Sequence, residues 1–154
     1  MLIGGIGGTN IISHEPTEGT KIIDEAYADP TVENFRRFFS MMLYDTSSIG
    51  DDVLQARVDA ALERPHQLEA RLEASRRFGM GVRRDNSEAL TKMNVKTMVF
   101  FGRNDRVSTV EAALRAVTLI PDSRLVLFSH CAHWVQYERP EAFNGTLLEF
   151  LDES

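Results

Sequence analysis

The sequence predicts a protein of the α/β class, in which a helical block precedes a parallel sheet that carries helices on both faces. Two observations support this prediction. From about residue 17 to residue 77, apolar residues recur at the three- and four-residue spacing of amphipathic helices. Beyond that stretch, two short and almost continuously apolar segments, 96–101 and 124–129, are each followed by a helical pattern. Apolar strands separated by helices are typical of parallel sheets that are buried on both sides.

The composition is that of a single ordinary globular domain. The chain has 154 residues, a length that allows one well-packed core. Its net charge is −6 and its basic residues are scattered, so we expect no nucleic-acid partner. The single cysteine, Cys131, excludes an internal disulfide, and the sequence shows no secretion signal and no apolar run of about 18 residues. We therefore expect a cytoplasmic protein with no membrane partner.

The first 16 residues indicate the end of a strand followed by a loop. The chain is apolar and then glycine-rich at its start, and the stretch up to Pro16 is rich in turn-forming residues. Gly5-Ile6-Gly7 is similar to the start of a dinucleotide-binding loop, but Asn10 stands where that motif has its third glycine. We expect a glycine-rich loop here and no nucleotide site.

Residues 17–80 are expected to form a helical region. One helix begins at Pro30-Thr31, and Asp51 or Asp52 caps another. Pro65 lies in the first turn of a third helix, and residues 76–86 are expected to form an exposed connection. The apolar positions that define the faces of the first two helices are Val32, Phe35, Phe38, Phe39, Met42 and Leu43, and then Val53, Leu54, Val58, Ala61 and Leu62.

Residues 81–154 are expected to form a β-α-β-α unit. Its expected elements are a short helix over 87–93, a strand over 96–101, a helix over 109–119, a strand over 124–129 and a final helix from Pro140. The apolar stripe of the final helix consists of Phe143, Leu147, Leu148 and Leu151. The chain thus divides into a strand end and loop (1–16), a helical region (17–80) and the β-α-β-α unit (81–154).

Two polar residues that follow the two apolar strands form the candidate site. Asp105 lies in the polar turn after the first strand, and His133 lies in the loop after the second. The carboxyl ends of neighbouring parallel strands lie close together, so these two side chains can meet. An aspartate bound to one imidazole nitrogen leaves the other as a general base near neutral pH. An Asp followed by a His is also the chain order of the last two members of the Ser…Asp…His triad of α/β-hydrolases.

Each candidate residue also has a simpler interpretation. Asp105 lies in ordinary turn sequence, and His130 in the same loop is an alternative to His133. Arg57 falls roughly 40° from Val53 on a helical wheel, which places it inside the apolar arc of its helix. It either binds a substrate carboxylate or extends along the edge of the apolar stripe into solvent.

The sequence gives little support to other nucleophiles or to a metal site. Cys131 is close to His133, but a small buried apolar role is expected for it. His130, Cys131 and His133 lack a further ligand at a plausible spacing, so no metal is expected. No serine has glycine both two residues before and two residues after it, and the nearest match, Ser48, follows a helix instead of a strand. The chain therefore carries no nucleophile elbow.

Taken together, these residues resemble the C-terminal part of the meta-cleavage product hydrolases, which are C–C bond hydrolases of the α/β-hydrolase superfamily. The resemblance implies a partial α/β-hydrolase fold whose N-terminal half is absent. In that fold, the helical region is the cap and the β-α-β-α unit contains the last strands and helices of the sheet. The matching runs are Phe101-Gly102-Arg103-Asn104-Asp105-Arg106, Cys131-Ala132-His133-Trp134-Val135-Gln136-Tyr137-Glu138, Glu141-Ala142-Phe143-Asn144, Met42-Leu43-Tyr44-Asp45 and Gln55-Ala56-Arg57.

The resemblance implies roles for five residues. Asp105 and His133 would be the acid and the base of the triad, and Trp134 would line the pocket. From the cap, Arg57 would contact the dienoate end of the substrate and Met42 would face the pocket for the acyl side. The implied reaction is the hydrolysis of 2-hydroxy-6-oxo-hexa-2,4-dienoates to a 2-hydroxypentadienoate and a carboxylic acid, with no metal or organic cofactor.

The missing nucleophile elbow predicts that the chain alone is inactive on such a substrate, because loss of a triad serine typically costs on the order of 10⁶ in turnover. We expect a truncated gene product that associates with a separate N-terminal half or with copies of itself. Two alternatives stay open. The chain could be a fragment of another capped α/β-hydrolase, such as an esterase, or it could be a non-catalytic half-protein or remnant.

Overall fold

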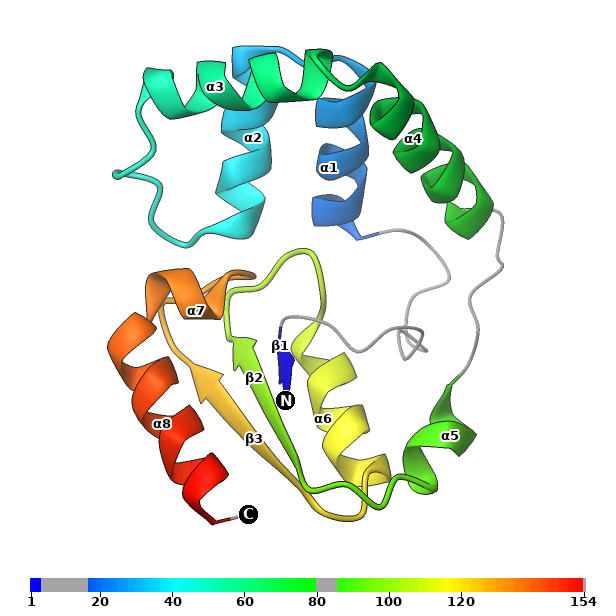
Figure 1. Cartoon of the computed structure of the whole chain (residues 1–154), viewed down its shortest axis with the longest axis vertical. Helices are drawn as coiled ribbons and strands as arrows, with labels where there is room; N and C mark the ends of the chain where they lie inside the picture. Colours follow the sequence, from blue (N-terminus) through cyan, green and yellow to red (C-terminus); the bar gives the residue numbers. More distant parts are fainter. Residues whose placement is uncertain (4–16, 80–85, 154) are drawn as a thin grey trace.

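Helices pack into a block at one end of a small parallel sheet (Figure 1). The computed structural model describes residues 1–3, 17–79 and 86–153. The block contains α1 (Glu18–Ala28), α2 (Val32–Met42), α3 (Asp51–Leu62) and α4 (Pro65–Gly79). The expected loop motif Gly5-Ile6-Gly7 lies outside the described residues.

The helices of the block begin at the residues that physical chemistry favours. Thr17 and Thr31 precede α1 and α2, and their hydroxyls accept hydrogen bonds from the amides of Thr20 and Asn34, both at 3.2 Å. The start of α2 expected at Pro30-Thr31 is therefore confirmed.

Two expectations about the other helices of the block are wrong. The residue before α3 is Gly50, so Asp51 and Asp52 do not cap the helix and instead lie in its first turn, where the helix dipole favours a carboxylate. Helix α4 begins at Pro65 as expected but continues through Gly79, so residues 76–79 of the expected connection are helical.

The core of the block is rich in aromatic side chains. Phe35 and Leu54 are fully buried, and Phe35 makes edge-to-face contacts with Tyr27 and Phe38. The apolar stripe expected on α3 is only partly correct. Leu54 and Val58 are buried, whereas Val53 is 39% exposed and Leu62 is 57% exposed. The helix presents one narrow face, with residues four apart, to the aromatic cluster, and the outer apolar residues remain in solvent.

The sheet has the order β1-β2-β3, and its neighbouring strands are parallel. Its strands are β1 (Leu2–Ile3), β2 (Thr97–Gly102) and β3 (Ser123–Phe128). Residues of β2 alternate between the two faces. Met98 and Phe100 pack with α8 (Pro140–Asp152), and Val99 and Phe101 pack with α6 (Val110–Leu119). The expected parallel sheet with a helix on each face is confirmed.

The remaining helices flank this unit. They are α5 (Ser87–Thr91) and α7 (Val135–Glu138), of which α7 was not expected from the sequence. On α8, the buried stripe is Phe143, Leu147 and Phe150, whereas Leu148 is 61% exposed and Leu151 is 55% exposed. The expected stripe was therefore wrong at its last two positions. Among the helices that the structure describes, none has the length and apolar character needed to cross a lipid bilayer.

Candidate acid–base site

Asp105 follows the end of β2 and has a fully buried side chain. One carboxylate oxygen, Oδ1, accepts hydrogen bonds from the backbone amides of Val107 at 2.8 Å and Ser108 at 2.9 Å. These two bonds fix the orientation of the carboxylate in its own turn. The other oxygen, Oδ2, is directed at the loop that follows β3.

His133 lies in that second loop and meets Asp105. The distance from His133 Nδ1 to Asp105 Oδ2 is 2.9 Å, and the His133 side chain is 23% exposed. Since a carboxylate only accepts hydrogen bonds, the contact favours the tautomer with a proton on Nδ1. His133 Nε2 has no hydrogen-bond partner among residues 1–3, 17–79 and 86–153. This nitrogen can therefore accept a proton and return it, as a general base and acid require.

The two loops approach each other closely because β2 ends in glycine. The amide of Arg103 donates to the Phe128 carbonyl, and that of Asn104 donates to the Cys131 carbonyl, both at 2.9 Å. A Cβ atom at Gly102 would lie 1.9 Å from the Ala132 carbonyl oxygen, which is far inside van der Waals contact. Only a residue without a side chain permits this approach.

The helical block is hydrogen-bonded to both loops. At the start of α1, the Gly19 amide donates to the Arg106 carbonyl at 3.0 Å and the Thr17 hydroxyl donates to the Val107 carbonyl at 2.8 Å. At the end of α2, the Met42 carbonyl accepts from the amides of His133 at 3.0 Å and Trp134 at 3.1 Å. The ends of α1 and α2 thus hold the two loops whose side chains form the pair.

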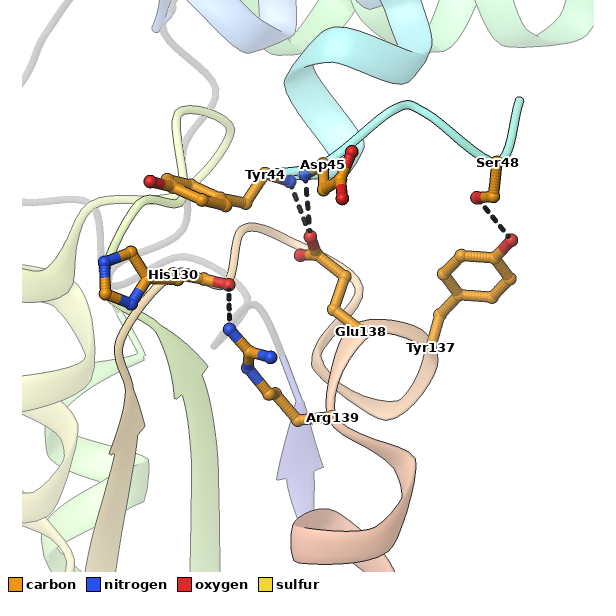
Figure 2. A pocket seen from close by; sticks show the side chains of 7 residues that line it. All are labelled: Tyr44, Asp45, Ser48, His130, Tyr137, Glu138 and Arg139. Carbon is orange, nitrogen blue, oxygen red and sulfur yellow. Dashed lines mark hydrogen bonds between the residues drawn. The ribbon is translucent and has the colours of Figure 1, made fainter. Parts of the chain in front are cut away.

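The structure distinguishes His133 from the alternative, His130. His130 is exposed, has a positive φ of 50° and packs its ring against Tyr44 at a centroid distance of 5.3 Å. It lines a separate surface pocket of about 300 Å³ together with Tyr137 (Figure 2). Of these two histidines, His133 is the one that contacts Asp105.

Trp134 and Met42 both lie where the helical block meets the sheet unit. The Trp134 ring contacts Phe38 and Phe39, with centroid distances of 6.1 and 5.8 Å. Met42 is 3% exposed and belongs to the aromatic core of the block, and its carbonyl bonds to the His133 loop. Both positions adjoin the acid–base pair.

Arg57 is solvent-exposed and is not enclosed in the apolar face of α3 as its helical-wheel position suggested. Its guanidinium donates a hydrogen bond to the Tyr27 hydroxyl and lies 5.8 Å from the ring centroids of both Tyr27 and Phe35. The side chain therefore extends over aromatic surface and keeps its charge in water, which is the simpler of the two interpretations. Its donors nonetheless remain accessible to an anion.

The other candidates do not form sites in the structure. Cys131 is fully buried, and burial, followed by the nearby Glu138 carboxylate, raises the pKa of its thiol to about 12. A thiol with such a pKa is a poor nucleophile, as the expected buried role implies. Ser48 lies in the turn between α2 and α3, with its Oγ 3.4 Å from the Tyr137 hydroxyl. In the described part of the chain, no group of three or more potential metal ligands is present.

Sequence reasoning missed Glu138 and Arg139, which both bond to the loop that carries His133. The only sequence signal was an adjacent pair of opposite charges just before the proline of the last helix.

Comparison with known proteins assigns the fold. The family described as alpha/beta hydrolase fold matches residues 20–140. The chain belongs to this family. As in other alpha/beta hydrolases, its Asp and His follow successive strands.

The relatives of this alpha/beta hydrolase include hydrolases named for 2-hydroxy-6-oxo acids. It is 36% identical to a 2-hydroxy-6-oxononadienedioate/2-hydroxy-6-oxononatrienedioate hydrolase of Pseudomonas putida, over 98% of this chain and 53% of the relative. The enzyme of the same name from Cupriavidus pinatubonensis is 34% identical, with 98% and 52% covered. The chain therefore spans about half the length of the curated relatives that it matches.

Solved structures with a similar fold include enzymes of the same kind. A meta-cleavage product hydrolase from Pseudomonas fluorescens superposes with a TM-score of 0.82 and 26% identity, covering 98% of this chain and 54% of that one. A serine hydrolase from the polyaromatic hydrocarbon-degrading bacterium Cycloclasticus zankles gives a TM-score of 0.84 and 28% identity, with 98% and 54% covered. The resemblance to meta-cleavage product hydrolases and the partial α/β-hydrolase fold are both confirmed.

Proposed function

We propose that this chain supplies the acid–base pair and the cap of a hydrolase that cleaves C–C bonds in 2-hydroxy-6-oxo-dienoates. The observation that carries the proposal is the 2.9 Å contact between Asp105 and His133 at the ends of adjoining parallel strands. The names of the relatives support the substrate class, because they specify 2-hydroxy-6-oxo acids with two carboxylates.

The proposed reaction adds water across the C5–C6 bond of the substrate. C6, the ketone carbon, gains the hydroxyl group and becomes a carboxylic acid, while C5 gains a proton and becomes the end of a 2-hydroxypentadienoate. His133 Nε2 takes the proton from the attacking hydroxyl group and returns it in a later step. Asp105 holds the imidazole in position and stabilises its positive charge.

The proposal assigns α1–α4 as a cap that binds the substrate. Arg57 binds a substrate carboxylate from α3, since a guanidinium presents several donors to an anion. Trp134 and Met42 line the pocket at the junction of cap and sheet unit. Because no serine in the chain stands between two suitably spaced glycines, the nucleophile belongs to a further polypeptide segment that pairs with this chain.

A chimaera tests this function. In it, this chain replaces the matching part of the Pseudomonas putida relative, and turnover is followed as loss of the absorbance of the yellow 2-hydroxy-6-oxononadienedioate. We expect turnover by the chimaera but not by this chain alone. His133→Gln in the chimaera should reduce kcat by about 10⁴-fold or more. A folded chimaera without turnover, or with turnover that His133→Gln leaves intact, would contradict the proposal.

The role of Arg57 has a matched control in Arg71, whose guanidinium also lies over the Tyr27 ring, at 4.5 Å from its centroid. In the chimaera, Arg57→Ala should raise the KM for the dienoate, whereas Arg71→Ala should change it little. If Arg57→Ala left the KM for the dienoate unchanged, the assignment of Arg57 to a substrate carboxylate would be wrong and the specific claim of a dienoate hydrolase would weaken.

A further inference from the structure

Glu138, the last residue of α7, accepts hydrogen bonds from three backbone amides. Its Oε1 accepts from Tyr44 at 2.6 Å and from Asp45 at 3.2 Å (Figure 2). Its Oε2 accepts from Ala132 at 2.6 Å. Ala132 directly precedes His133, and Tyr44 and Asp45 follow the end of α2. A single carboxylate therefore joins the His133 loop to the segment that leaves the helical block.

A carboxylate suits this arrangement on both of its oxygens. Each of its oxygens accepts hydrogen bonds and neither donates, and all three partners are donors. A glutamine in the same place would direct an NH₂ group at one of the two segments and lose the bonds to it. Hydrogen bonds to a charged acceptor are also stronger than neutral ones.

Arg139 holds the same loop from the other side. Its Nη2 donates to the His130 carbonyl at 2.6 Å (Figure 2) and to the Ser129 carbonyl at 3.2 Å. The positive φ of His130 is a conformation that a non-glycine residue rarely adopts without such support. Two successive residues of opposite charge thus bind the amide and the carbonyl groups of one short loop.

We infer that Glu138 is a positioning residue for His133, an inference that rests on the proposed acid–base function. Glu138 bonds to the backbone before the histidine and not to Asp105. It fixes the loop at the place where His133 Nδ1 lies 2.9 Å from Asp105 Oδ2. A loop displacement of about 1 Å would take that contact beyond hydrogen-bond distance.

The test compares Glu138→Gln with Glu153→Gln in the full chain. Both variants replace one carboxylate by an amide, but Glu153 lies after α8 and bonds to Lys96 and Arg124 instead of the His133 loop. The readout is the pair of imidazole ¹⁵N chemical shifts of His133, which report which nitrogen carries the proton. We expect one tautomer, protonated on Nδ1, in the wild type and in Glu153→Gln, and a mixture of tautomers in Glu138→Gln. An unchanged His133 signature in a folded Glu138→Gln chain overturns the inference.

Amide hydrogen exchange in the wild-type chain gives a second measurement that needs no variant. The amides of Ala132 and Tyr44 should exchange at least about tenfold more slowly than unprotected amides, and together, because one carboxylate holds both. Exchange of either amide at the unprotected rate overturns the inference.

In the chimaera, Glu138→Gln should lower kcat by about ten- to a hundredfold with little change in KM, since a misplaced base affects the chemical step. If the chimaera is active and Glu138→Gln leaves its kcat unchanged, the positioning role of Glu138 is contradicted and the proposed function is not. An inactive chimaera whose His133 signature still depends on Glu138 contradicts the proposed function and leaves the positioning intact.

Discussion

The close approach at Gly102 makes Gly102→Ala the most informative single substitution in this chain. The added Cβ would lie 1.9 Å from the Ala132 carbonyl oxygen and 2.5 Å from that of Cys131. Both contacts are to backbone, which cannot rotate away as a flexible side chain could. The loop that carries His133 must therefore move by about 1.5 Å to restore a normal contact.

That displacement breaks specific hydrogen bonds. The bond from the Asn104 amide to the Cys131 carbonyl is 2.9 Å long, and that from the Ala132 amide to Glu138 is 2.6 Å long. Losing these two bonds costs about 1 kcal/mol each. With the strain of an overpacked site, we expect the free energy of unfolding to fall by about 3–5 kcal/mol. That is a large part of the stability of a domain of this size.

Urea denaturation followed by circular dichroism measures this loss, and Gly145→Ala is the matched control. Gly145 lies inside α8, and a Cβ there would meet no atom within 4 Å. Alanine should stabilise that helix by about 0.5–1 kcal/mol. With an m-value of about 2 kcal/mol/M, the midpoint for Gly102→Ala should fall by roughly 1.5–2.5 M. A Gly102→Ala chain that unfolds at the wild-type urea concentration would refute the argument that the two loops are held in rigid contact.

Three further substitutions or treatments have defined outcomes. Cys131, with its pKa raised to about 12 and no exposed surface, should resist iodoacetamide at pH 8 until urea unfolds the chain; rapid labelling in buffer would contradict this. The hydrogen bonds from Arg124 and Lys96 lower the pKa of Glu153 from 4.5 to about 2. The stability that these bonds add is therefore present above about pH 4.5 and is lost as the pH falls toward 2. The difference in urea midpoint between wild type and Glu153→Gln should therefore shrink over that interval, and a constant difference would oppose the assignment. Phe35→Ala should cost about 3–5 kcal/mol because the ring is fully buried in the helical block, and a loss below 1 kcal/mol, measured by urea unfolding, would show that the block is loosely packed.

The sheet unit was predictable because its patterns are unambiguous. Two short apolar runs with an amphipathic helix between them have one common solution, and β2 is indeed buried at all six positions. The helical block was predictable in kind but less so in detail. On α3, Val53 and Leu54 are neighbours of similar hydrophobicity, and only the packing against α2 determines that Leu54 is the buried one.

The Asp105–His133 pair could be expected from chain order and the edge of the sheet, but the choice of His133 over His130 rested on the family resemblance alone. Both histidines occupy one short loop, and the path of that loop depends on Arg139, Glu138 and the carbonyl of Met42. Met42 comes from a distant segment, and no local pattern predicts that the Glu138 carboxylate bonds to three amides. The sequence left both interpretations of Arg57 open for a related reason, because a helical wheel does not show which aromatic rings lie beside a long side chain.

The contacts of α1 and α2 with the two loops restrict how the helices could be exchanged between relatives. In sequence, α1–α4 form an insertion between β1 and α5, so a different set of helices could be grafted there while the strands are left intact. Such a graft would keep the sheet but would have to reproduce the small residue at Gly19, where a Cβ would lie 2.6 Å from the Arg106 carbonyl oxygen. It would also need a carbonyl where Met42 now offers one. Substrate preference can diversify by such exchange only within the limits that these two backbone positions impose.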